Sequence, residues 1–482
     1  MKLRELLAGV PICADSADLE MEISGVSYDS RTTRPGDLFV AMTGFATDGH
    51  QYIAKALANG AAAVLCQRRP AEACAYVQTE DSRRALAVIG GNWFGHPAEE
   101  MTMIAVTGTC GKTTTTYLLK AILEQARGAK VGLIGTNQNM IGSDVIPTER
   151  TTPESFEVQK LFREMADAGC THVVMETSSH ALYLDRVYGV RYDVGIFTNL
   201  TQDHLDFHKT MENYCDAKAI LFRNCVTGVV NADDPWTPRL LKDADCKVMT
   251  YAEQADADLR AENIVLSAGG IAFDAVSGAE RAPIRVNIPG GFMVYNTLDV
   301  LGAALALGIS LEESAAVLEK VPHVKGRVEI VPTPGKDYTI LIDYAHTPDS
   351  MVNVLQTVKE FAKGRTVAVF GCGGDRDRTK RPLMGKAAAD WSDFAVVTTD
   401  NPRTEEPEAI IADILPGFDG SATPYHVVVD RIEAIHWAMD HAETDDVIVL
   451  CGKGHETYQE VNHVKHHMDE REIVADYLSS GR

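Results

Sequence analysis

The stretch from residue 106 to 114, Val-Thr-Gly-Thr-Cys-Gly-Lys-Thr-Thr, has the residue types of a phosphate-binding loop. It follows a short apolar run and precedes a helical pattern, which is the strand, turn and helix context that such a loop requires. Gly108 and Gly111 let backbone N–H groups surround a phosphate, Lys112 can neutralise outer phosphates, and the Thr113 hydroxyl can ligate Mg²⁺. Val106 stands where the usual pattern has its first glycine, so we interpret the stretch as a shortened phosphate-binding loop. The alternative is a glycine-rich turn that binds no phosphate.

Other residues whose side chains could bind metal or take part in catalysis also lie at or after the ends of apolar runs. Glu176 ends the run 172–176, where a sheet shared with the phosphate loop would place a second magnesium contact; helix capping is the alternative. The run 194–197 leads to residues 203–208, whose two histidines and two aspartates fit a metal site and a polar loop equally well. Lys218, by periodicity, is only a lysine on a helix.

Four loops in the last third of the chain also follow apolar strand-like runs, and they begin at Asp343, Gly371, Asp400 and Cys451. Ligands of an open parallel sheet bind beyond the carboxyl ends of its strands, so we expect these loops to share one crevice. Four basic residues between positions 376 and 381, with Arg403 and Lys453, predict a cationic crevice; a solvated charge run is the alternative.

Composition limits the class of protein. The 482 residues predict about three domains. The net charge of −23 argues against a nucleic-acid surface. Ten cysteines without a CxxC pair indicate reduced thiols, and no apolar stretch reaches the ~18 residues of a membrane span. We expect a cytoplasmic protein.

The elements that position these residues alternate between strand and helix, which predicts α/β domains with largely parallel sheets. We place the domains at 1–98, 99–324 and 325–482. Thr151 and Thr152 are expected to cap a helix with Pro153 in its first turn. A second helix is expected from Thr297 to Leu307, after a glycine turn.

Taken together, the motifs resemble those of the Mur ligases, in family order along the whole chain. They are Thr107-Gly108-Thr109-x-Gly111-Lys112-Thr113-Thr114, Glu176-x-Ser178-Ser179-His180, Thr198-Asn199-Leu200-x-x-Asp203-His204-Leu205-Asp206, Asp343-Tyr344-Ala345-His346-x-Pro348 and Asp400-Asn401-Pro402-Arg403. Two positions depart from the pattern. Cys110 stands where the family usually has Asn, and Met293 where a second Asn often precedes Asn296.

The resemblance implies a small UDP-sugar-binding domain, a central phosphate-loop ATPase domain and a Rossmann-like amino-acid-binding domain. It implies that ATP phosphorylates the D-Glu carboxylate of UDP-MurNAc-L-Ala-D-Glu and that an amine then attacks the acyl phosphate, in peptidoglycan precursor synthesis. The implied partners are small molecules only, and we expect a monomer.

Site residues are carried over from the family motifs. The implied ATP contacts are Thr107, Gly108, Thr109, Cys110, Gly111, Lys112, Thr113, Asn296, Arg327, Asp343 and His346. The implied Mg²⁺ ligands are Thr113, Glu176, His204 and Lys218, the last as a carbamylated lysine (N6-carboxylysine), because a cation cannot ligate a cation. The implied muramoyl-dipeptide contacts are Ser30, Thr151, Thr152, Ser178 and Arg186; Ser30 by itself is equally a turn residue. Lys112, Glu176, His204 and Lys218 form the implied catalytic set.

The incoming amino acid is expected to be meso-diaminopimelate. Its second carboxylate, absent from lysine, suits the planar fork of Arg403. The other implied contacts are Arg376, Asp400, Asn401, Pro402, Gly452 and Glu456, with Glu456 placed to pair with an ammonium. The rival within ligases is folylpolyglutamate synthase, which lacks the Asp-Asn-Pro-Arg tetrad and the first domain. A phosphate-loop switch and a non-catalytic scaffold are rivals of other classes.

Overall fold

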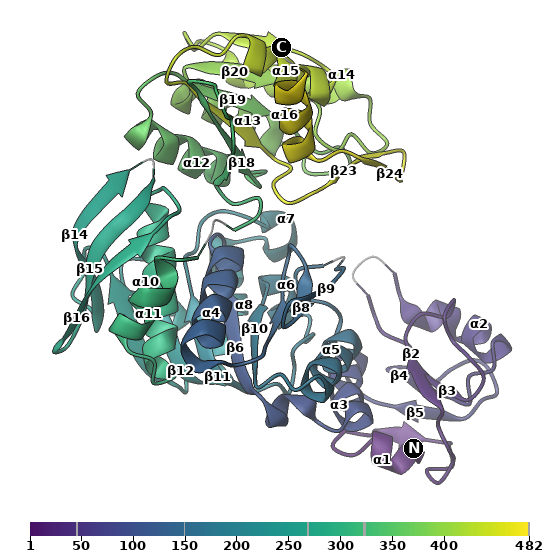
Figure 1. The fold of residues 1–482 in the computed structure, drawn as a ribbon. Coiled ribbons are helices and arrows are strands. Elements are labelled where there is room, and N and C mark those ends of the chain that lie inside the picture. Colours follow the sequence, from purple (N-terminus) through teal and green to yellow (C-terminus); the bar gives the residue numbers. More distant parts are fainter. Residues whose placement is uncertain (45–46, 149, 268, 322–323, 481–482) are drawn as a thin grey trace.

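A computed structural model describes residues 1–44, 47–148, 150–267, 269–321 and 324–480. Three α/β domains follow one another along the chain (Figure 1). The first contains a sheet of order β1-β5-β4-β3-β2, parallel except for β1. Its elements are α1 Leu3–Leu6, β1 Ala14–Asp15, β2 Gly25–Ser27, β3 Asp37–Val40, α2 Ile53–Ala58, β4 Ala63–Cys66, β5 Tyr76–Gln78 and α3 Ser82–Phe94.

The central domain contains an eleven-stranded sheet of order β16-β15-β14-β13-β12-β11-β6-β10-β7-β8-β9. Its first half comprises β6 Thr102–Thr107, α4 Lys112–Arg127, β7 Val131–Ile134, β8 Asn139–Ile141, β9 Asp144–Ile146, α5 Ser155–Asp167, β10 His172–Glu176, α6 Ser179–Tyr183, β11 Tyr192–Phe197, α7 Leu205–His208 and α8 Met211–Ala219. The second half comprises β12 Cys225–Asn231, α9 Thr237–Leu240, β13 Lys247–Ala252, β14 Leu259–Ser267, β15 Gly270–Ser277, β16 Glu280–Val286, α10 Phe292–Ala306 and α11 Leu311–Leu318.

The strands from β7 to β14 in this order pair in parallel, and β6 lies between β10 and β11. Parallel register brings the carboxyl ends of β6, β10 and β11 to one edge, which is where the phosphate loop begins. The antiparallel strands β8, β9, β15 and β16 extend both ends of the sheet, and sequence reasoning missed them together with β12 to β14.

The C-terminal domain contains a six-stranded sheet of order β17-β18-β22-β19-β20-β21, and β23 pairs with β24 in a separate hairpin. Its elements are β17 Glu329–Val331, β18 Thr339–Asp343, α12 Pro348–Phe361, β19 Thr366–Phe370, α13 Lys380–Trp391, β20 Phe394–Val397, α14 Pro407–Ile414, β21 Tyr425–Val427, α15 Arg431–Asp440, β22 Val447–Cys451, β23 Tyr458–Val461, β24 Val464–His467 and α16 Glu470–Ser479. Single 3-10 turns occupy Gly49–Tyr52, Pro97–Glu100, Leu221–Arg223 and Leu415–Phe418.

Two expected helix starts are wrong. Helix α5 begins at Ser155 with Glu154 as its N-cap, because the Thr152 hydroxyl is engaged by the Glu176 carbonyl and the Ser178 N–H instead of by the helix. Pro153 therefore precedes the helix. Helix α10 begins at Phe292, directly after the glycine turn, so Asn296 lies on the helix.

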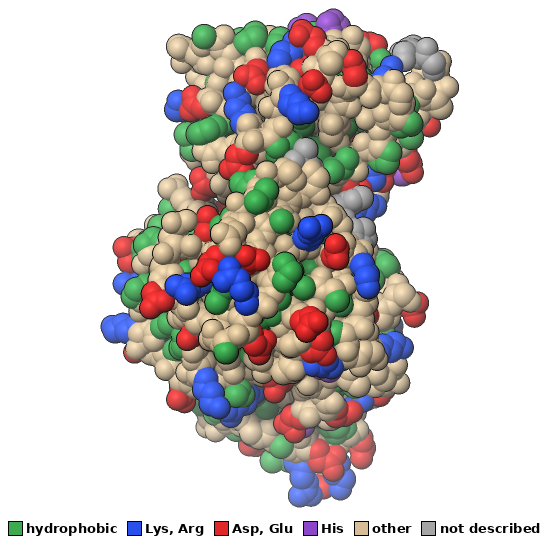
Figure 2. All heavy atoms as spheres, turned by 60° about the vertical axis from the view of Figure 1, so that its left-hand side comes forward, with side chains coloured by type: hydrophobic (Ala, Val, Ile, Leu, Met, Phe, Trp, Pro, Cys, Tyr) green, Lys and Arg blue, Asp and Glu red, His purple; other side chains and the backbone are tan. Residues whose placement is uncertain are grey.

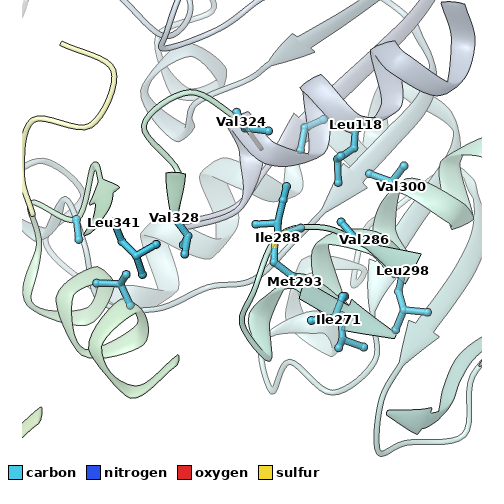
Figure 3. Close-up of a cluster of buried hydrophobic side chains, with 14 of the residues drawn as sticks. Leu118, Ile271, Val286, Ile288, Met293, Leu298, Val300, Val324, Val328 and Leu341 are labelled. Atoms are coloured by element: carbon cyan, nitrogen blue, oxygen red, sulfur yellow. The ribbon is translucent and has the colours of Figure 1, made fainter. Parts of the chain in front are cut away.

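A buried apolar cluster connects the central and C-terminal domains. It includes Ile288 and Met293 from the central domain, Val324 and Val328 from the connection, and Leu341 from β18 (Figure 3). On the face shown in Figure 2, the C-terminal domain joins the rest across a narrower waist, and acidic and basic side chains are intermixed. Among the described helices, none has the length and hydropathy that a bilayer-spanning segment requires.

Candidate active site

The loop between β6 and α4 needs its two glycines. Gly108 and Gly111 have φ of +152° and +89°, backbone angles that residues with a side chain rarely adopt. A Cβ at Gly108 would lie 1.9 Å from Thr198 Oγ1, and one at Gly111 would lie 2.3 Å from Asn296 Oδ1. The loop backbone therefore lies in close contact with Thr198, which follows β11, and with Asn296 on α10. Helix α4 begins directly after the loop.

Cys110 contributes to the loop through its backbone. Its N–H donates to Asn199 Oδ1 at 3.0 Å, and its carbonyl oxygen accepts from Thr198 Oγ1 at 2.6 Å and Asn199 Nδ2 at 3.2 Å. The amide of Asn199 thus holds both sides of the same residue. The replacement of the usual asparagine by cysteine leaves these contacts intact.

The ammonium of Lys112 folds back onto its own loop. Lys112 Nζ donates to the carbonyl oxygens of Gly108 and Thr109, both at 2.8 Å. Burial lowers the pKa of Lys112, and the nearby Glu176 carboxylate opposes that shift. A phosphate oxygen is a stronger partner for an ammonium than a neutral carbonyl, so the loop can exchange these contacts for a nucleotide phosphate.

Thr113 and Glu176 form a pair of oxygen ligands. Thr113 Oγ1 donates to Glu176 Oε1 at 2.9 Å, and the buried Glu176 also accepts from the N–H and hydroxyl of Thr136, each at 2.9 Å. Adjacent ligands of an octahedral Mg²⁺, each at ~2.1 Å from the ion, are about 3 Å apart. The spacing and donor types therefore fit one magnesium ion completed by phosphate and water oxygens.

Lys218 is fully buried beside the same loop. Its Nζ donates to the Gly108 carbonyl oxygen at 2.8 Å and lies 4.4 Å from the centre of the Tyr214 ring. Burial and then the charge of Lys112 hold the pKa of Lys218 well below its usual range. Within the described residues no carboxylate pairs with this lysine. The side chain is thus a buried amine favoured in its neutral, nucleophilic form.

His204 lies at the edge of the site with a left-handed backbone, φ +54°. Its Nε2 is 3.4 Å from Asp203 Oδ2, and its ring packs 4.8 Å from that of His180. In the part of the chain that the structure describes, three or more His, Cys, Asp or Glu side chains nowhere gather as a metal cage. Among the described side chains of this segment, Asp203, His204 and His208 therefore form no such cage on their own.

One cavity of about 660 Å³ between the central and C-terminal domains joins these groups. Predicted residues on its wall are Thr109, Cys110, Gly111, Lys112, Thr113, Thr151, Glu176, Ser178, His204, Asn296, Arg327, Asp343 and His346. Residues that sequence reasoning missed include Thr136, Asn231, Asp233, Asp234, Phe292 and Tyr295, and Tyr344 was quoted only as part of a motif. Asn231 ends the strand β12, and Asp233 and Asp234 follow it, so a polar strand end was an available signal.

Residues from the domain connection and from the carboxyl end of β18 line one side of this cavity. Arg327 Nη2 donates to Thr113 Oγ1 at 3.1 Å, and its guanidinium lies 5.0 Å from the centre of the Tyr344 ring. The buried Asp343 accepts from the Val328 N–H at 2.8 Å, and burial raises its pKa. Burial and Lys380 lower the pKa of His346 to about 4, so its Nδ1–H donates to the Tyr344 carbonyl oxygen from a neutral ring.

The residues expected to bind the muramoyl dipeptide are partly engaged with one another. Thr152 Oγ1 donates to the Glu176 carbonyl oxygen and accepts from the Ser178 N–H, and the Thr152 carbonyl oxygen accepts from Arg186 Nη1 at 3.1 Å. Thr151 Oγ1 is 2.9 Å from Thr136 Oγ1. Ser30 lies in the first domain, buried, with its carbonyl oxygen bound to Asn59 Nδ2.

A second group of predicted residues meets at the carboxyl edge of the C-terminal sheet. Asn401 Nδ2 donates to Glu456 Oε2 at 2.9 Å, and the buried Lys453 Nζ donates to both Asn401 Oδ1 and Glu456 Oε2. Gly452 is required beside them, because a Cβ there would lie 2.5 Å from Asp400 Oδ2. Asp400 Oδ2 is buried without a hydrogen-bond partner among the described residues. Pro402 is also buried, with its carbonyl oxygen against Gly374.

The expected cationic crevice is largely neutralised by acids. Arg381 is buried and pairs with Glu405 and Asp413, and Arg378 also pairs with Glu405. Arg403 pairs with Glu460 at 3.1 Å. Arg376 is exposed, with its guanidinium on the Asp375 carbonyl oxygen. Two residues of the predicted basic run, Arg378 and Arg381, therefore pair with acidic side chains, and Arg381 is part of the folded interior.

Family models match all three domains. The Mur ligase family catalytic domain matches residues 22–92, the Mur ligase middle domain matches 106–304, and the Mur ligase glutamate ligase domain matches 326–454. A Clostridium botulinum protein named UDP-N-acetylmuramoyl-L-alanyl-D-glutamate--2,6-diaminopimelate ligase is 49% identical over 463 residues, 95% of each chain.

The chain belongs to the Mur ligase family.

Solved structures agree with this family. One, titled as a UDP-N-acetylmuramoyl-L-alanyl-D-glutamate--2,6-diaminopimelate ligase, is 32% identical with a TM-score of 0.72, covering 100% of this chain and 99% of its own. Mycobacterium tuberculosis folylpolyglutamate synthase shares the fold at 20% identity and a TM-score of 0.64, over 77% of this chain. The family assignment therefore extends over the whole chain, and the folylpolyglutamate likeness shows only the fold.

Proposed function

We propose that this chain is an ATP-dependent ligase that joins meso-diaminopimelate to the D-Glu carboxylate of UDP-MurNAc-L-Ala-D-Glu, releasing ADP and phosphate, in peptidoglycan precursor synthesis. One observation carries the proposal: the phosphate loop, the Thr113–Glu176 pair and the Arg327 contact line one cavity between two domains. The relatives' names supply the reaction, and the cavity supplies groups able to perform it.

The chemistry follows from the reactivity of a carboxylate, which is a poor acceptor for an amine. Transfer of the ATP γ-phosphoryl group to a carboxylate oxygen gives an acyl phosphate and ADP. The amine then forms the amide bond at the acyl carbon, and inorganic phosphate leaves with the carbon–oxygen bond electrons. Such transfer requires mainly positioning and charge neutralisation. Lys112 and the N–H groups of the loop would bind and orient the outer phosphates.

Thr113 and Glu176 would hold one Mg²⁺, which supplies charge neutralisation at the phosphates when bound. We propose that Glu176, His204 and a carbamylated Lys218 hold a second. The support is that the Lys218 amine is buried, lacks an anionic partner among described residues and is favoured in the neutral form that reacts with CO₂. Carbamylation converts it into an anion that balances the adjacent Lys112 ammonium.

We place the domains at 1–98 for the UDP-sugar end, 99–324 for ATP and 325–482 for the amino acid. Ser30, Thr151, Thr152, Ser178 and Arg186 would bind the muramoyl dipeptide. Asn296, Arg327, Asp343 and His346 would bind the nucleotide. Cytoplasmic location is supported by ten unpaired cysteine thiols and by the requirement for ATP. The monomeric state stays a prediction.

Selectivity for diaminopimelate over lysine would come from Arg403, with Arg376, Asp400, Asn401, Pro402, Gly452 and Glu456 around it. The Arg403 side chain is 17% exposed, so a ligand without a carboxylate would leave partly buried donors unpaired. Such a loss corresponds to a preference for diaminopimelate over lysine on the order of 10³-fold.

The test uses the purified chain with UDP-MurNAc-L-Ala-D-Glu, ATP and Mg²⁺, and offers either meso-diaminopimelate or L-lysine. We expect ADP formation only when both the muramoyl dipeptide and an amine are present, and a product mass that contains diaminopimelate. The substitution Lys112→Ala should abolish formation of this product. ATP hydrolysis without an amide product would indicate a switch or motor instead, and comparable turnover of the two amino acids would contradict the role of Arg403.

A further inference from the structure

The connection between the central and C-terminal domains lies directly against the loop that follows β22. Gly326 in the connection has φ +71°, and a Cβ on it would lie 2.2 Å from the His455 nitrogen and 2.4 Å from the Gly454 carbonyl carbon. The Gly326 carbonyl oxygen accepts from the Tyr344 N–H at 3.0 Å. A Cβ on Gly454 would in turn lie 2.6 Å from the Tyr344 Cβ. Three backbone segments therefore meet here with no room for another side chain.

Glu329 and Arg471 bridge two of these segments. The Gly326 N–H donates to Glu329 Oε2 at 2.6 Å. Arg471 Nε donates to Glu329 Oε1 at 2.8 Å, and Arg471 Nη2 donates both to Glu329 Oε2 and, at 3.0 Å, to the Gly454 carbonyl oxygen. The Glu329 and Arg471 side chains are only 9% and 19% exposed, so water weakens this charge-assisted pair little. We call the pair the hinge clamp.

The hinge clamp lies between the two halves of the proposed site. Arg327, which follows Gly326, reaches Thr113 Oγ1 of the phosphate loop at 3.1 Å. Glu456, two residues after Gly454, belongs to the proposed amino-acid site at the carboxyl edge of the C-terminal sheet. Because the clamp joins Gly326 to Gly454, it holds the loop that carries the amino-acid site at a fixed place relative to the phosphate loop.

We propose that Glu329 and Arg471 are positioning residues that direct the acyl phosphate to the amine instead of to water. This inference rests on the proposed function and goes beyond it. In the productive step, the amine nitrogen bonds to the acyl carbon, the phosphate leaves with the carbon–oxygen bond electrons, and one nitrogen proton passes to that phosphate.

Water competes with the amine for the same carbon. Its attack re-forms the D-Glu carboxylate and releases phosphate and a proton, so that ATP is consumed without an amide. A misplacement of ~1 Å between reacting groups can slow a reaction by ~10²-fold, whereas solvent water needs no such positioning. Loss of the hinge clamp should therefore slow amide formation more than it slows formation of the acyl phosphate.

The test measures two products of one reaction, ADP and the tripeptide, with UDP-MurNAc-L-Ala-D-Glu, ATP, Mg²⁺ and saturating meso-diaminopimelate. We expect the unaltered chain to form about one tripeptide per ADP, and Glu329→Gln and Arg471→Gln to lower that ratio at least ~2-fold. Arg471→Lys, which keeps the charge but loses the planar fork, should lower it less. The ratio is counted per turnover, so it does not depend on how much of a variant is folded.

Asp446→Asn is the matched control. Asp446 is also a buried acid of the C-terminal domain, it pairs with Arg365 at 2.7 Å, and it accepts from the N–H groups of Arg365 and Glu443, both at 2.8 Å. It precedes β22, so it lies at the end of that strand opposite to the loop that the clamp holds. We expect its loss to lower the thermal unfolding midpoint but to leave the ratio of tripeptide to ADP unchanged.

An unchanged ratio in both Glu329→Gln and Arg471→Gln would overturn the inference. An equal fall in Asp446→Asn would overturn it as well, because any weakening of the domain would then have the same effect. If neither neutral variant folds, Arg471→Lys decides, and a ratio equal to that of the unaltered chain counts against the clamp. Failure of the unaltered chain to form any tripeptide would instead contradict the proposed function.

Discussion

At the residue scale, Lys218 departs furthest from what its residue type suggests. A lysine is normally a solvated cation, yet this one is buried within hydrogen-bond distance of the phosphate-loop carbonyl that also holds Lys112. Two ammonium groups on one carbonyl oxygen repel each other, and burial adds to the cost. Conversion of one amine to a carbamate anion would turn that repulsion into attraction.

We therefore expect Lys218→Ala to lower kcat at least ~10²-fold, because a proposed metal ligand is lost. Short carboxylic acids such as acetate should restore part of the rate by occupying the emptied space as a carboxylate. The measurement is ADP release with increasing acetate. Lys242→Ala, an exposed lysine of the same domain, should be unaffected and insensitive to acetate. Full activity of Lys218→Ala, or a loss that no short acid repairs, would remove the carbamylation proposal.

At the element scale, α4 and α10 bring the two sides of the nucleotide cavity together. Thr115 on α4 donates to both carboxyl oxygens of Asp299 on α10 at 3.0 Å, and Asp299 is completely buried. Burial raises the pKa of Asp299 well above its ordinary range, against the smaller effect of the Thr115 hydrogen bond. The helices that carry Thr113 and Asn296 are thus connected by a carboxyl group that is costly to ionise.

This arrangement predicts a pH-dependent difference in stability. The folded-state pKa exceeds the unfolded one, so the folded state retains a proton that the unfolded state releases, and stability falls as pH rises between the two values. Asp299→Asn does not titrate. Its free energy of unfolding, measured in denaturant titrations, should therefore rise relative to that of the original chain as the pH rises above the ordinary Asp pKa of ~4, by at most about 1.4 kcal/mol per pH unit. Asp256→Asn, at an exposed position, should give a flat difference, and a flat difference for Asp299→Asn would contradict the assignment.

At the scale of the whole molecule, the nucleotide cavity is shared between domains that meet across a short connection. Arg327 reaches Thr113 from this connection, and Val328 has φ +44°, which is unusual for a β-branched residue. The Val328 N–H is held by Asp343, and its side chain belongs to the apolar cluster of Figure 3. A ligand in this cavity contacts both domains and so favours one relative orientation.

We expect a non-hydrolysable ATP analogue with Mg²⁺ to slow amide hydrogen exchange at Gly326, Arg327 and Val328. The physical reason is that a ligand that binds only the closed arrangement raises the free energy of opening. Hydrogen exchange with mass spectrometry measures the effect, and the exposed turn at Gly278, remote in sequence, is an internal control. Lys112→Ala should lose the protection. Equal exchange with and without bound nucleotide would indicate that the domains do not close on it.

The sequence by itself determined the α/β class, the phosphate loop and the residues at the strand ends, because short apolar runs followed by polar or glycine-rich turns are local signals. The strand β19 ends at Phe370, directly before the loop that was predicted to begin at Gly371. Lys112 and Thr113, which follow β6, lie beside Glu176, which ends the neighbouring strand β10.

Only the tertiary structure decided which charged groups pair. The sequence predicted that the Arg403 guanidinium binds a ligand carboxylate, but β23 folds back and places Glu460 in an ion pair with it. Lys453 likewise forms an ion pair with Glu456. Likewise Thr152 does not cap α5, because Glu176 and Ser178 engage its hydroxyl. Arg403 and Glu460 lie 57 residues apart along the chain, and Thr152 and Glu176 lie 24 apart. The energy of a charge or hydroxyl depends on burial and on neighbours within a few ångströms. Local patterns therefore located the chemistry, and long-range packing set the charge and orientation with which each group meets a ligand.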